Sequence, residues 1–394
     1  MKKINTRFAV HYHIPATLNN DKIYFPFYFS KWIDELCVIF KEVILIVHTY
    51  NQKPTTDEIP LKSTNIKIIN LGPKDDFFLK RVFKFRYYQK IIKKNLNLFD
   101  IVCFRYPSPL TIYLNLALGN KPSFPIIVGN MWQLVFYADI TFLKKIILFI
   151  YWYLDHTIFS FLYRSKLVFS IYNAKKVFPF LSKVTFLHTS TINKTDVVNT
   201  PKALPKNVYT LITVSRMAKD KGISSLIKAV NEVKNRGIKI RLNVVGGSND
   251  YELSNLKNEV SKLNLKNEVK FFGQIASYKV LSHFDNADIK IVPALVDFSP
   301  RTTWEAASRG LPIIMSEGVG MGINKEHFHK NNKMLFFKAN NYKNLADQIE
   351  KVSSDNVLFK QLQKNSIDIA KERTLENSVK YLVENLIKEN YINE

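Results

Sequence analysis

The chain has 394 residues, enough for two domains of ordinary size, each with its own hydrophobic core. Hydrophobic residues make up 46% and charged residues 23%, as in a globular protein, and two cysteines alone exclude a disulfide framework and a thiolate zinc site. The net charge of +24 leaves two explanations open: an anionic partner, or the Lys-rich and Asn-rich composition that AT-rich coding produces.

The N-terminal stretch, MKKINTRFAVHYHIPATLNN, has no long apolar region before a small-residue cleavage site, so we expect a cytoplasmic protein. His11 and His13 lie where its first apolar run ends, and Asn130 follows the run FPIIVG in the same way. These three residues are candidates for an acceptor-binding cleft, with a purely structural role as the alternative. No glycine-rich loop follows the first strand.

The segment at residues 77–98, FFLKRVFKFRYYQKIIKKNLNL, has the period of a basic amphipathic helix. Its predicted membrane-facing cations include Lys80, Arg81, Lys84, Lys93 and Lys94. Such a helix lies on an anionic membrane surface, or packs on its own domain and leaves a solvated basic face. Both interpretations stay open.

The most apolar segment, residues 144–166, reads KKIILFIYWYLDHTIFSFLYRSK. Asp155 and His156 interrupt it, so we expect a run too short to span a bilayer. The aromatic residues around 136–163 are then a second membrane-docking surface or a part of the core.

Short apolar runs alternate with helical patterns along the whole chain, which predicts parallel sheets covered by helices. A polar segment with prolines near 201–205 separates two such series, and most glycines follow it. We therefore predict an N-terminal Rossmann-like domain at 1–200, a second one at 206–372, and a C-terminal helix at 373–394 that packs back toward the first. Glycines after strands favour the second domain for nucleotide binding.

Two cations lie in a predicted turn between a strand and a helix, in LITVSRMAKDKGISSLIKAV. Arg216 and Lys221, five residues apart beside a helix N-terminus, suit a diphosphate, although both also suit a solvated loop. Gly246 and Gly247 follow the next strand and permit close approach of a ligand, or form an ordinary turn.

Two acids eight residues apart flank a helix start in VPALVDFSPRTTWEAASRGLPII. We expect Ser299 to be the N-cap and Pro300 the first helical residue, with Asp297 on the preceding loop and Glu305 inside the helix. Gly310 ends this predicted helix.

The motifs VSRM and KG, VVGGS, VKFFGQI, ADIKIVP, and acid-x7-acid before AASRGLPII occur in this order over residues 208–375. Together they resemble family-4 glycosyltransferases, which are retaining enzymes of the GT-B fold. The resemblance implies an α/β protein of two Rossmann-like domains whose parallel sheets face each other across a cleft. It also implies that the N-terminal domain binds the acceptor.

At the matching positions, the resemblance implies that Glu305 holds the ribose and that Arg216 and Lys221 neutralise the leaving diphosphate. Asp297 would contact the sugar, but the family usually has the longer Glu there, and its glycine-rich filler is replaced by FSPRTTW. We expect the remaining donor contacts from a set comprising Gly246, Gly247, Ser299, Arg301 and Thr302.

The resemblance implies a retaining hexosyltransferase, and because Arg216 and Lys221 can neutralise the leaving diphosphate, we expect it to need no metal ion or cofactor. It would move a sugar from a nucleotide sugar, a UDP-sugar first of all, to a glycan or polyprenyl-linked acceptor in bacterial surface-glycan synthesis such as capsule or lipopolysaccharide. We expect it at the inner face of the cytoplasmic membrane. The alternatives are a catalytically weakened partner subunit and a nucleotide-sugar epimerase. No nucleic-acid-binding module is recognisable, and the pair His327 and His329 lacks a third metal ligand.

Overall fold

The computed structural model of the chain describes residues 3–74, 78–137, 140–172, 174–205, 207–295, 297, 300–319 and 333–393. The chain divides into two compact units. Unit 1 comprises Met1–Leu187 and Val379–Glu394, and unit 2 comprises His188–Ser378.

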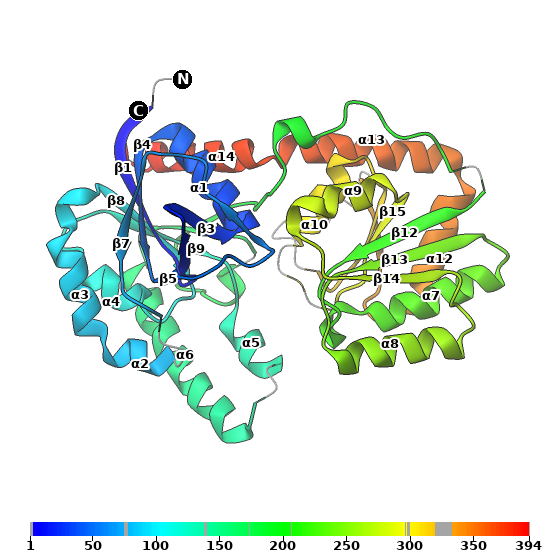
Figure 1. Cartoon of the computed structure of the whole chain (residues 1–394), viewed down its shortest axis with the longest axis horizontal. Helices are drawn as coiled ribbons and strands as arrows, with labels where there is room; N and C mark the ends of the chain where they lie inside the picture. The colour runs from blue at the N-terminus through cyan, green and yellow to red at the C-terminus, as the bar shows by residue number, and fades with distance from the viewer. Residues whose placement is uncertain are drawn as a thin grey trace. The chain divides into compact units, whose positions relative to one another are not determined.

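Unit 1 is built on a seven-stranded parallel sheet (Figure 1). Its strands lie in the order β11 (Lys183–Phe186), β10 (Leu167–Ser170), β9 (Ser123–Ile127), β8 (Ile101–Tyr106), β1 (Ile4–His11), β4 (Phe40–Val47) and β7 (Ile66–Asn70). Helices cover parallel sheets on both faces, which explains why the sequences of these strands are continuous apolar runs. Every residue of β8 is buried, for example.

A second, four-stranded sheet lies in the same unit. It contains β5 (Thr49–Asn51), β2 (Ala16–Asn19), β3 (Lys22–Pro26) and β6 (Glu58–Pro60) in that order. Asn20 and Asp21 connect β2 to β3 with φ values of 47° and 56°, a conformation that Asn and Asp tolerate better than most residues. This sheet was not predicted from the sequence, because its strands are too short and too polar to show a period.

The helices described in unit 1 before its C-terminal segment are α1 (Phe27–Ile39), α2 (Phe78–Phe83), α3 (Phe85–Lys94), α4 (Thr111–Leu116), α5 (Met131–Tyr137) and α6 (Phe142–Leu162). The basic segment thus forms two helices that meet at Lys84, where one was expected. Tyr88 and Ile92 of α3 are buried in the core that β4 and β8 share. Its apolar face therefore packs on its own unit.

Arg81 corrects the predicted membrane-facing set, because it is only 7% exposed. Lys80, Lys84, Lys93 and Lys94 are exposed. A buried guanidinium does not reach lipid headgroups, so Arg81 does not belong to a basic surface.

Unit 2 is built on a six-stranded parallel sheet. Its strands lie in the order β14 (Val269–Gly273), β13 (Ile240–Val245), β12 (Tyr209–Val214), β15 (Ile289–Val292), β16 (Ile313–Ser316) and β17 (Leu335–Phe337). The strand order reverses direction between β12 and β15, and in open parallel sheets ligands bind at the carboxyl ends of the strands beside such a reversal.

Helices cover both faces of this sheet. Figure 1 shows α7 (Ile223–Asn235), α8 (Asp250–Lys262) and α12 (Tyr342–Ser354) on one face, and α9 (Val280–Asp285), α10 (Arg301–Ser308) and α13 (Asn356–Glu372) on the other. Each unit contains a parallel sheet with helices, which confirms the expected α/β fold of two Rossmann-like domains.

The boundary between the units lies after Leu187, earlier than the polar segment near 201–205 suggested. Residues from His188 onward pack with unit 2: Ile192 is fully buried beside Trp304 and Ile369, and Val198 N–H donates to the carbonyl of Ser308 at 2.9 Å. The polarity of the segment reflects its surface course and not a domain junction.

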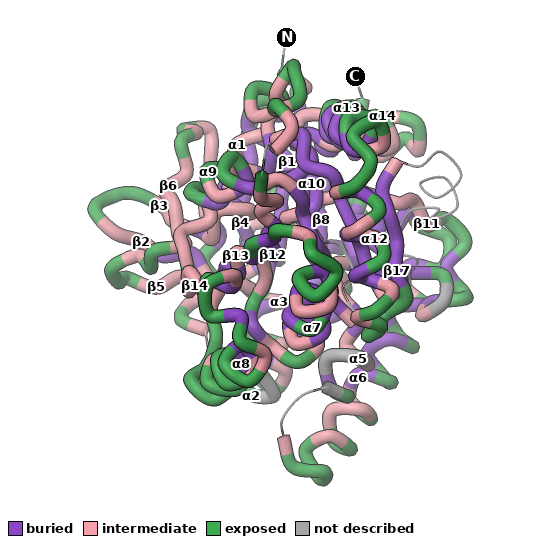
Figure 2. Tube along the Cα trace, turned by 90° about the vertical axis from the view of Figure 1, so that its right-hand side faces the viewer, coloured by how far each residue is buried: buried purple, intermediate pink, exposed green. Residues whose placement is uncertain are grey.

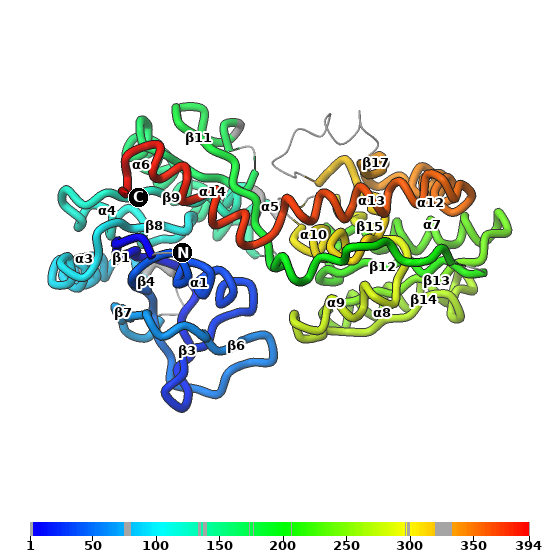
Figure 3. The backbone as a smooth tube through the Cα atoms, turned by 90° about the horizontal axis from the view of Figure 1, so that it is seen from above, coloured from blue at the N-terminus to red at the C-terminus, as the bar shows by residue number. Residues whose placement is uncertain are grey.

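The chain ends in α14 (Leu375–Lys388), whose residues from Val379 onward belong to unit 1. Tyr391 accepts a hydrogen bond from Leu167 N–H at 3.1 Å, and Glu389 pairs with Lys183 at 2.6 Å. Figure 3 shows this red end among the elements of unit 1. The C-terminal segment from Val379 onward is therefore part of unit 1 and contacts its strands β10 and β11.

Candidate active site

Three loops meet where β12, β13 and β14 of unit 2 end. Ser215 N–H donates to the Val245 carbonyl at 3.0 Å, Met217 N–H to Gly247 at 2.8 Å, and Gly246 N–H to Gly273 at 2.9 Å. A Cβ on Gly246, whose φ is 140°, would lie 1.9 Å from the Ser215 carbonyl oxygen. Gly246 is therefore required for loop packing, which is a use that sequence reasoning did not foresee.

The loop after β12 is joined tightly to the loop after β15. Gly222 adopts φ 65° between η4 (Lys219–Lys221) and α7, and a Cβ there would lie 2.1 Å from the Pro293 carbonyl oxygen. Leu295 N–H donates to the Asp220 carbonyl at 2.8 Å. These contacts bring Lys221, a predicted diphosphate-binding cation, close to Asp297, the first of the two predicted acids.

Lys221 Nζ lies 2.9 Å from Asp297 Oδ2 and 3.4 Å from Asp220 Oδ2. The Lys221 side chain is 13% exposed and that of Asp297 is 23% exposed, so this ion pair is screened less than a surface pair. Arg216 lies on the same loop, and its side chain is exposed. A cation set of this kind can receive a diphosphate.

Glu305 lies inside α10 and is 8% exposed. The hydroxyl of Thr191 donates a hydrogen bond to Glu305 Oε1. Thr302 Oγ1 donates to the Val214 carbonyl at 3.2 Å, which ties the first turn of α10 to the end of β12. The second acid is thus held by both the helix and the segment before β12.

Pro300 is the N-cap of α10, which begins at Arg301, one residue later than expected. Gly310, with φ 72°, follows the C-cap Arg309, as expected of a glycine that ends a helix. The predicted N-cap Ser299 lies outside the described residues. Arg301 is half-buried in the first turn.

Lys290 is a functional candidate that sequence reasoning missed. It lies in β15, is 1% exposed, and has its Nζ 5.5 Å from the ring centroid of Phe284. Burial lowers the pKa of Lys290 to about 7, while the carboxylates of Glu305 and Asp297 act in the opposite direction. A lysine inside the apolar run DIKIVPAL was the signal that could have identified it.

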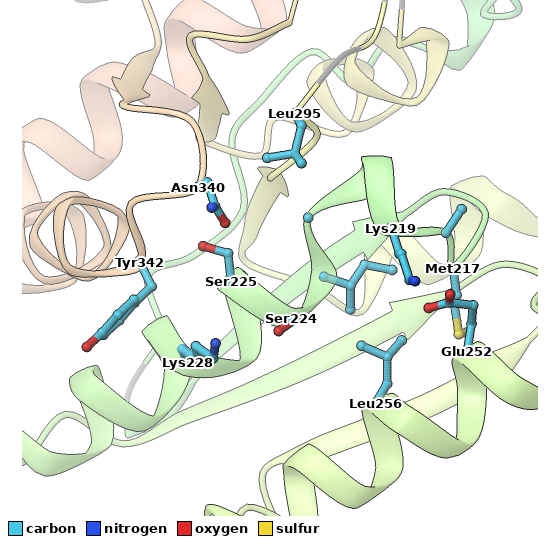
Figure 4. Close-up of a pocket in the computed structure, with 13 residues that line it drawn as sticks. Met217, Lys219, Ser224, Ser225, Lys228, Glu252, Leu256, Leu295, Asn340 and Tyr342 are labelled. Carbon is cyan, nitrogen blue, oxygen red and sulfur yellow. The ribbon is translucent and has the colours of Figure 1, made fainter. Parts of the chain in front are cut away.

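A cavity of about 350 Å³ lies behind the Gly222 turn. Figure 4 shows the first turn of α7 at its centre, with Lys219 and Glu252 on one side and Asn340 and Tyr342 on the other. Lys219 lines this cavity and Lys221 does not, although both lie in the same short 3-10 turn. The side chain of Lys219 therefore faces the cavity, whereas that of Lys221 forms an ion pair with Asp297.

In unit 1, two of the three predicted acceptor residues have internal partners. His11 is fully buried, with Nδ1 2.9 Å from the Ile46 carbonyl and Nε2 3.2 Å from Ser108 Oγ. Asn130 Oδ1 accepts from Trp132 N–H at 3.0 Å, in the first turn of α5. These contacts correct the prediction for His11, because neither of its ring nitrogens is available to an acceptor, whereas the role of Asn130 stays a prediction.

His13 also stays a candidate acceptor-binding residue. Burial, followed by the charges of Lys74, His11 and Arg105, lowers its pKa to about 3, so the ring is neutral near pH 7. Its Nδ1 is buried without a hydrogen-bond partner among the described residues. Arg105, which sequence reasoning missed, is 8% exposed, and its Cζ lies 4.8 Å from the ring centroid of Tyr12.

Among the described residues, no group of three or more His, Cys, Asp or Glu side chains is placed to hold a metal ion. His327 and His329 lie outside that part of the chain.

Residues 198–373 match the family model described as Glycosyl transferases group 1. The putative colanic acid biosynthesis glycosyltransferase WcaL of Escherichia coli is 25% identical over 124 residues, 31% of this chain and 28% of the relative. The alpha-monoglucosyldiacylglycerol synthase of Streptococcus pneumoniae is 30% identical over 105 residues, 27% of this chain and 23% of the relative. The matched segments thus span about a quarter of these relatives.

Among solved structures, Anabaena HepE in complex with UDP and glucose superposes with a TM-score of 0.69 at 12% identity. The superposition covers 98% of this chain and 100% of that one. Such a likeness shows a common fold over the entire length.

Proposed function

We propose that this chain, whose residues 198–373 match the glycosyl transferases group 1 family model, is a retaining hexosyltransferase that uses a UDP-sugar. The acceptor we propose is a lipid-linked or polysaccharide glycan in the synthesis of a bacterial surface polymer. The observation that carries the proposal is the meeting of Lys221 and Asp297 at the end of β12, beside the sheet's reversal point.

The proposed reaction breaks the bond between the anomeric carbon of the sugar and the diphosphate, so negative charge grows on the leaving oxygen. Lys221 and Arg216 stabilise this charge more than they stabilise the bound donor, which lowers the barrier. Because two protein cations supply the charge, the proposed reaction needs neither a metal ion nor another cofactor.

The two acids have separate proposed roles. Asp297, held by Lys221 at 2.9 Å, accepts hydrogen bonds from hydroxyls of the transferred sugar. Glu305, deeper in the unit, accepts them from the ribose of the nucleotide. Gly246, Gly247 and Arg301 flank the donor in this proposal.

The relatives support this choice of substrates. One relative is named for colanic acid biosynthesis and another for a glycolipid, and a structure of the same fold contains UDP and glucose. On the acceptor side, His13 offers unit 1 a neutral ring nitrogen, which suits a hydroxyl of a lipid-linked glycan.

The test is the turnover of Lys221→Ala, measured as release of the nucleoside diphosphate from a panel of nucleotide sugars with a bacterial glycolipid extract as acceptor. Losing a charge-stabilising donor lowers turnover by about 100-fold or more. Lys219→Ala is the matched control from the same turn and should stay within about twofold of the wild type, as expected of an exposed lysine.

Near-normal turnover by Lys221→Ala would contradict the assigned role. If the wild-type protein binds a nucleoside diphosphate but consumes no donor, the chain is a non-catalytic partner subunit instead.

A further inference from the structure

Helix α6 presents a second apolar face that its own unit leaves uncovered. Trp152, Asp155, His156, Phe159 and Ser160 are its buried residues. Nine large apolar residues on other positions are 39% to 80% exposed, namely Phe142, Leu143, Ile146, Ile147, Ile150, Tyr153, Leu154, Ile158 and Phe161. Helices of soluble proteins normally keep the uncovered face polar.

The helix has 21 residues and includes Asp155 and His156, which were expected to interrupt its apolar run. It is, within the described part of the chain, the single helix long and apolar enough to cross a membrane, and 22% of its most apolar window is buried. Asp155 is buried, and Tyr106 Oη donates a hydrogen bond to Asp155 Oδ2 at 2.6 Å.

One face of the second half of α6 belongs to the protein core, so lipid cannot surround the helix. The buried residues Asp155 and Phe159 pack against β8, where Tyr106 stacks on Phe159 with ring centroids 3.9 Å apart. The first half of the helix extends away from the sheet (Figure 1), and Figure 2 shows it as exposed and intermediate. This geometry suits a helix that lies in a membrane interface and not one that crosses it.

The charges around this face are complementary to anionic lipid. Lys144 and Lys145 lie in its first turn, and Arg164 and Lys166 follow its last residue. Asp155 is the one acid in residues 140–166, and it is buried. Unit 1, residues 1–187 and 379–394, carries 28 Lys and Arg against 14 Asp and Glu, a charge of +14, which would attract an anionic surface.

A cavity of about 500 Å³ continues the apolar face. Tyr153 and Phe161 of the face also line the cavity, together with Trp132, Phe180 and Arg164. His156 lines it as well: this residue is 6% exposed, and its Nε2 has no hydrogen-bond partner among the described residues. The cavity thus combines aromatic walls, one acceptor nitrogen and one cation.

We propose that the uncovered face of α6 docks on an anionic lipid bilayer and that the adjoining cavity takes one lipid of that bilayer. The hydrocarbon chain lies against Trp132 and Phe161, Arg164 binds the phosphate, and His156 Nε2 accepts a hydrogen bond from a headgroup hydroxyl. This inference does not depend on the proposed transferase activity.

The first test is co-sedimentation with vesicles of phosphatidylglycerol and phosphatidylcholine. The double variant Ile150→Glu with Leu154→Glu should bind at least about tenfold more weakly than the wild type, because two charges enter the apolar face. Val38→Glu is the control, since Val38 is 63% exposed on α1, and it should bind as the wild type does. Binding should weaken in high salt and on phosphatidylcholine alone.

The second test locates the lipid chain by tryptophan quenching with brominated phosphatidylglycerol. Quenching should be largely lost in Trp132→Phe and kept in Trp32→Phe, because Trp32 lies elsewhere in unit 1, with its ring centroid 5.8 Å from that of Phe29. Unchanged quenching in Trp132→Phe would overturn the cavity assignment.

Docking itself would be overturned by a wild-type protein that stays in the supernatant at low salt, or by equal binding of the double variant. A wild-type dimer in the absence of vesicles that the double variant converts to a monomer would also overturn it, because a second copy would then cover α6.

Discussion

Glu305 is held in place by a hydroxyl from the segment that precedes β12. Thr191→Val removes this hydrogen bond without changing the shape of the side chain, and hydrogen bonds to charged groups contribute roughly 1.5 to 3 kcal/mol. We expect the affinity for the nucleoside diphosphate to fall about tenfold, measured by calorimetric titration.

Thr303→Val is the matched control, because Thr303 is fully buried in α10 and its hydroxyl has no partner among the described residues. The two variants should therefore differ in affinity while both fold. Equal affinities would show that Thr191 does not position Glu305.

Lys290 makes a prediction about pH. Its pKa of about 7 in the folded protein lies below the value near 10.4 of an unfolded lysine, so the unfolded chain binds more protons between these limits. The free energy of unfolding therefore rises with pH from about 7 toward 10 on account of this residue. Lys290→Met should be more stable than the wild type at pH 7, and its advantage should shrink as the pH rises.

Thermal unfolding of the wild type and Lys290→Met at pH 7 and pH 9.5 checks this prediction. All other titrating groups are the same in the two proteins, so the change in their stability difference with pH reports on Lys290. A stability difference that is the same at both pH values would contradict the assigned cause.

At the scale of elements, the turn that carries Lys221 depends on Gly222. Gly222→Ala places a Cβ 2.1 Å from the Pro293 carbonyl oxygen at a φ of 65°, so the loops after β12 and β15 must separate. We expect a loss of roughly 1 to 3 kcal/mol in stability and a fall in donor affinity, measured by chemical unfolding and titration.

Gly237→Ala is the control that separates backbone strain from the steric clash with Pro293. Gly237 also has a positive φ, of 83°, but no atom lies within 4 Å of the Cβ that alanine would add. It should lose less stability than Gly222→Ala and keep its donor affinity. If the two variants behave alike, the contact with Pro293 is not what holds the turn.

Parallel strands and the donor-side motifs could be predicted from the sequence, because apolar runs and short turn motifs are local patterns. The apolar runs that form β8 and β15 illustrate this, as does Gly310, which was expected to end a helix and follows the C-cap of α10. Contacts between residues far apart in the chain could not be predicted: Thr191 meets Glu305 across 114 residues, and nothing local in HTSTIN indicates it. The same limit applies to Arg81, which has the pattern of a surface cation but is buried.

For the whole molecule, the apolar segment 144–166 shows why a sequence period alone is ambiguous. A helix with apolar residues on all sides is buried or meets lipid, and only the structure shows that α6 packs one face and leaves the other uncovered. In the basic segment at 77–98, by contrast, the apolar face of α3 is buried in the core of unit 1 and is not available to a membrane. The membrane surface that we propose therefore lies on α6.

The central claim is that unit 2 binds the nucleoside diphosphate of a sugar donor between Lys221 and Glu305. Calorimetric titration of a panel of nucleoside diphosphates against the wild type, Glu305→Gln and Lys219→Ala tests it most directly. We predict that one of them, UDP first of all, binds the wild type and Lys219→Ala alike and binds Glu305→Gln at least about tenfold more weakly. Equal binding to the wild type and Glu305→Gln, or no binding of any nucleoside diphosphate to the wild type, would contradict the account.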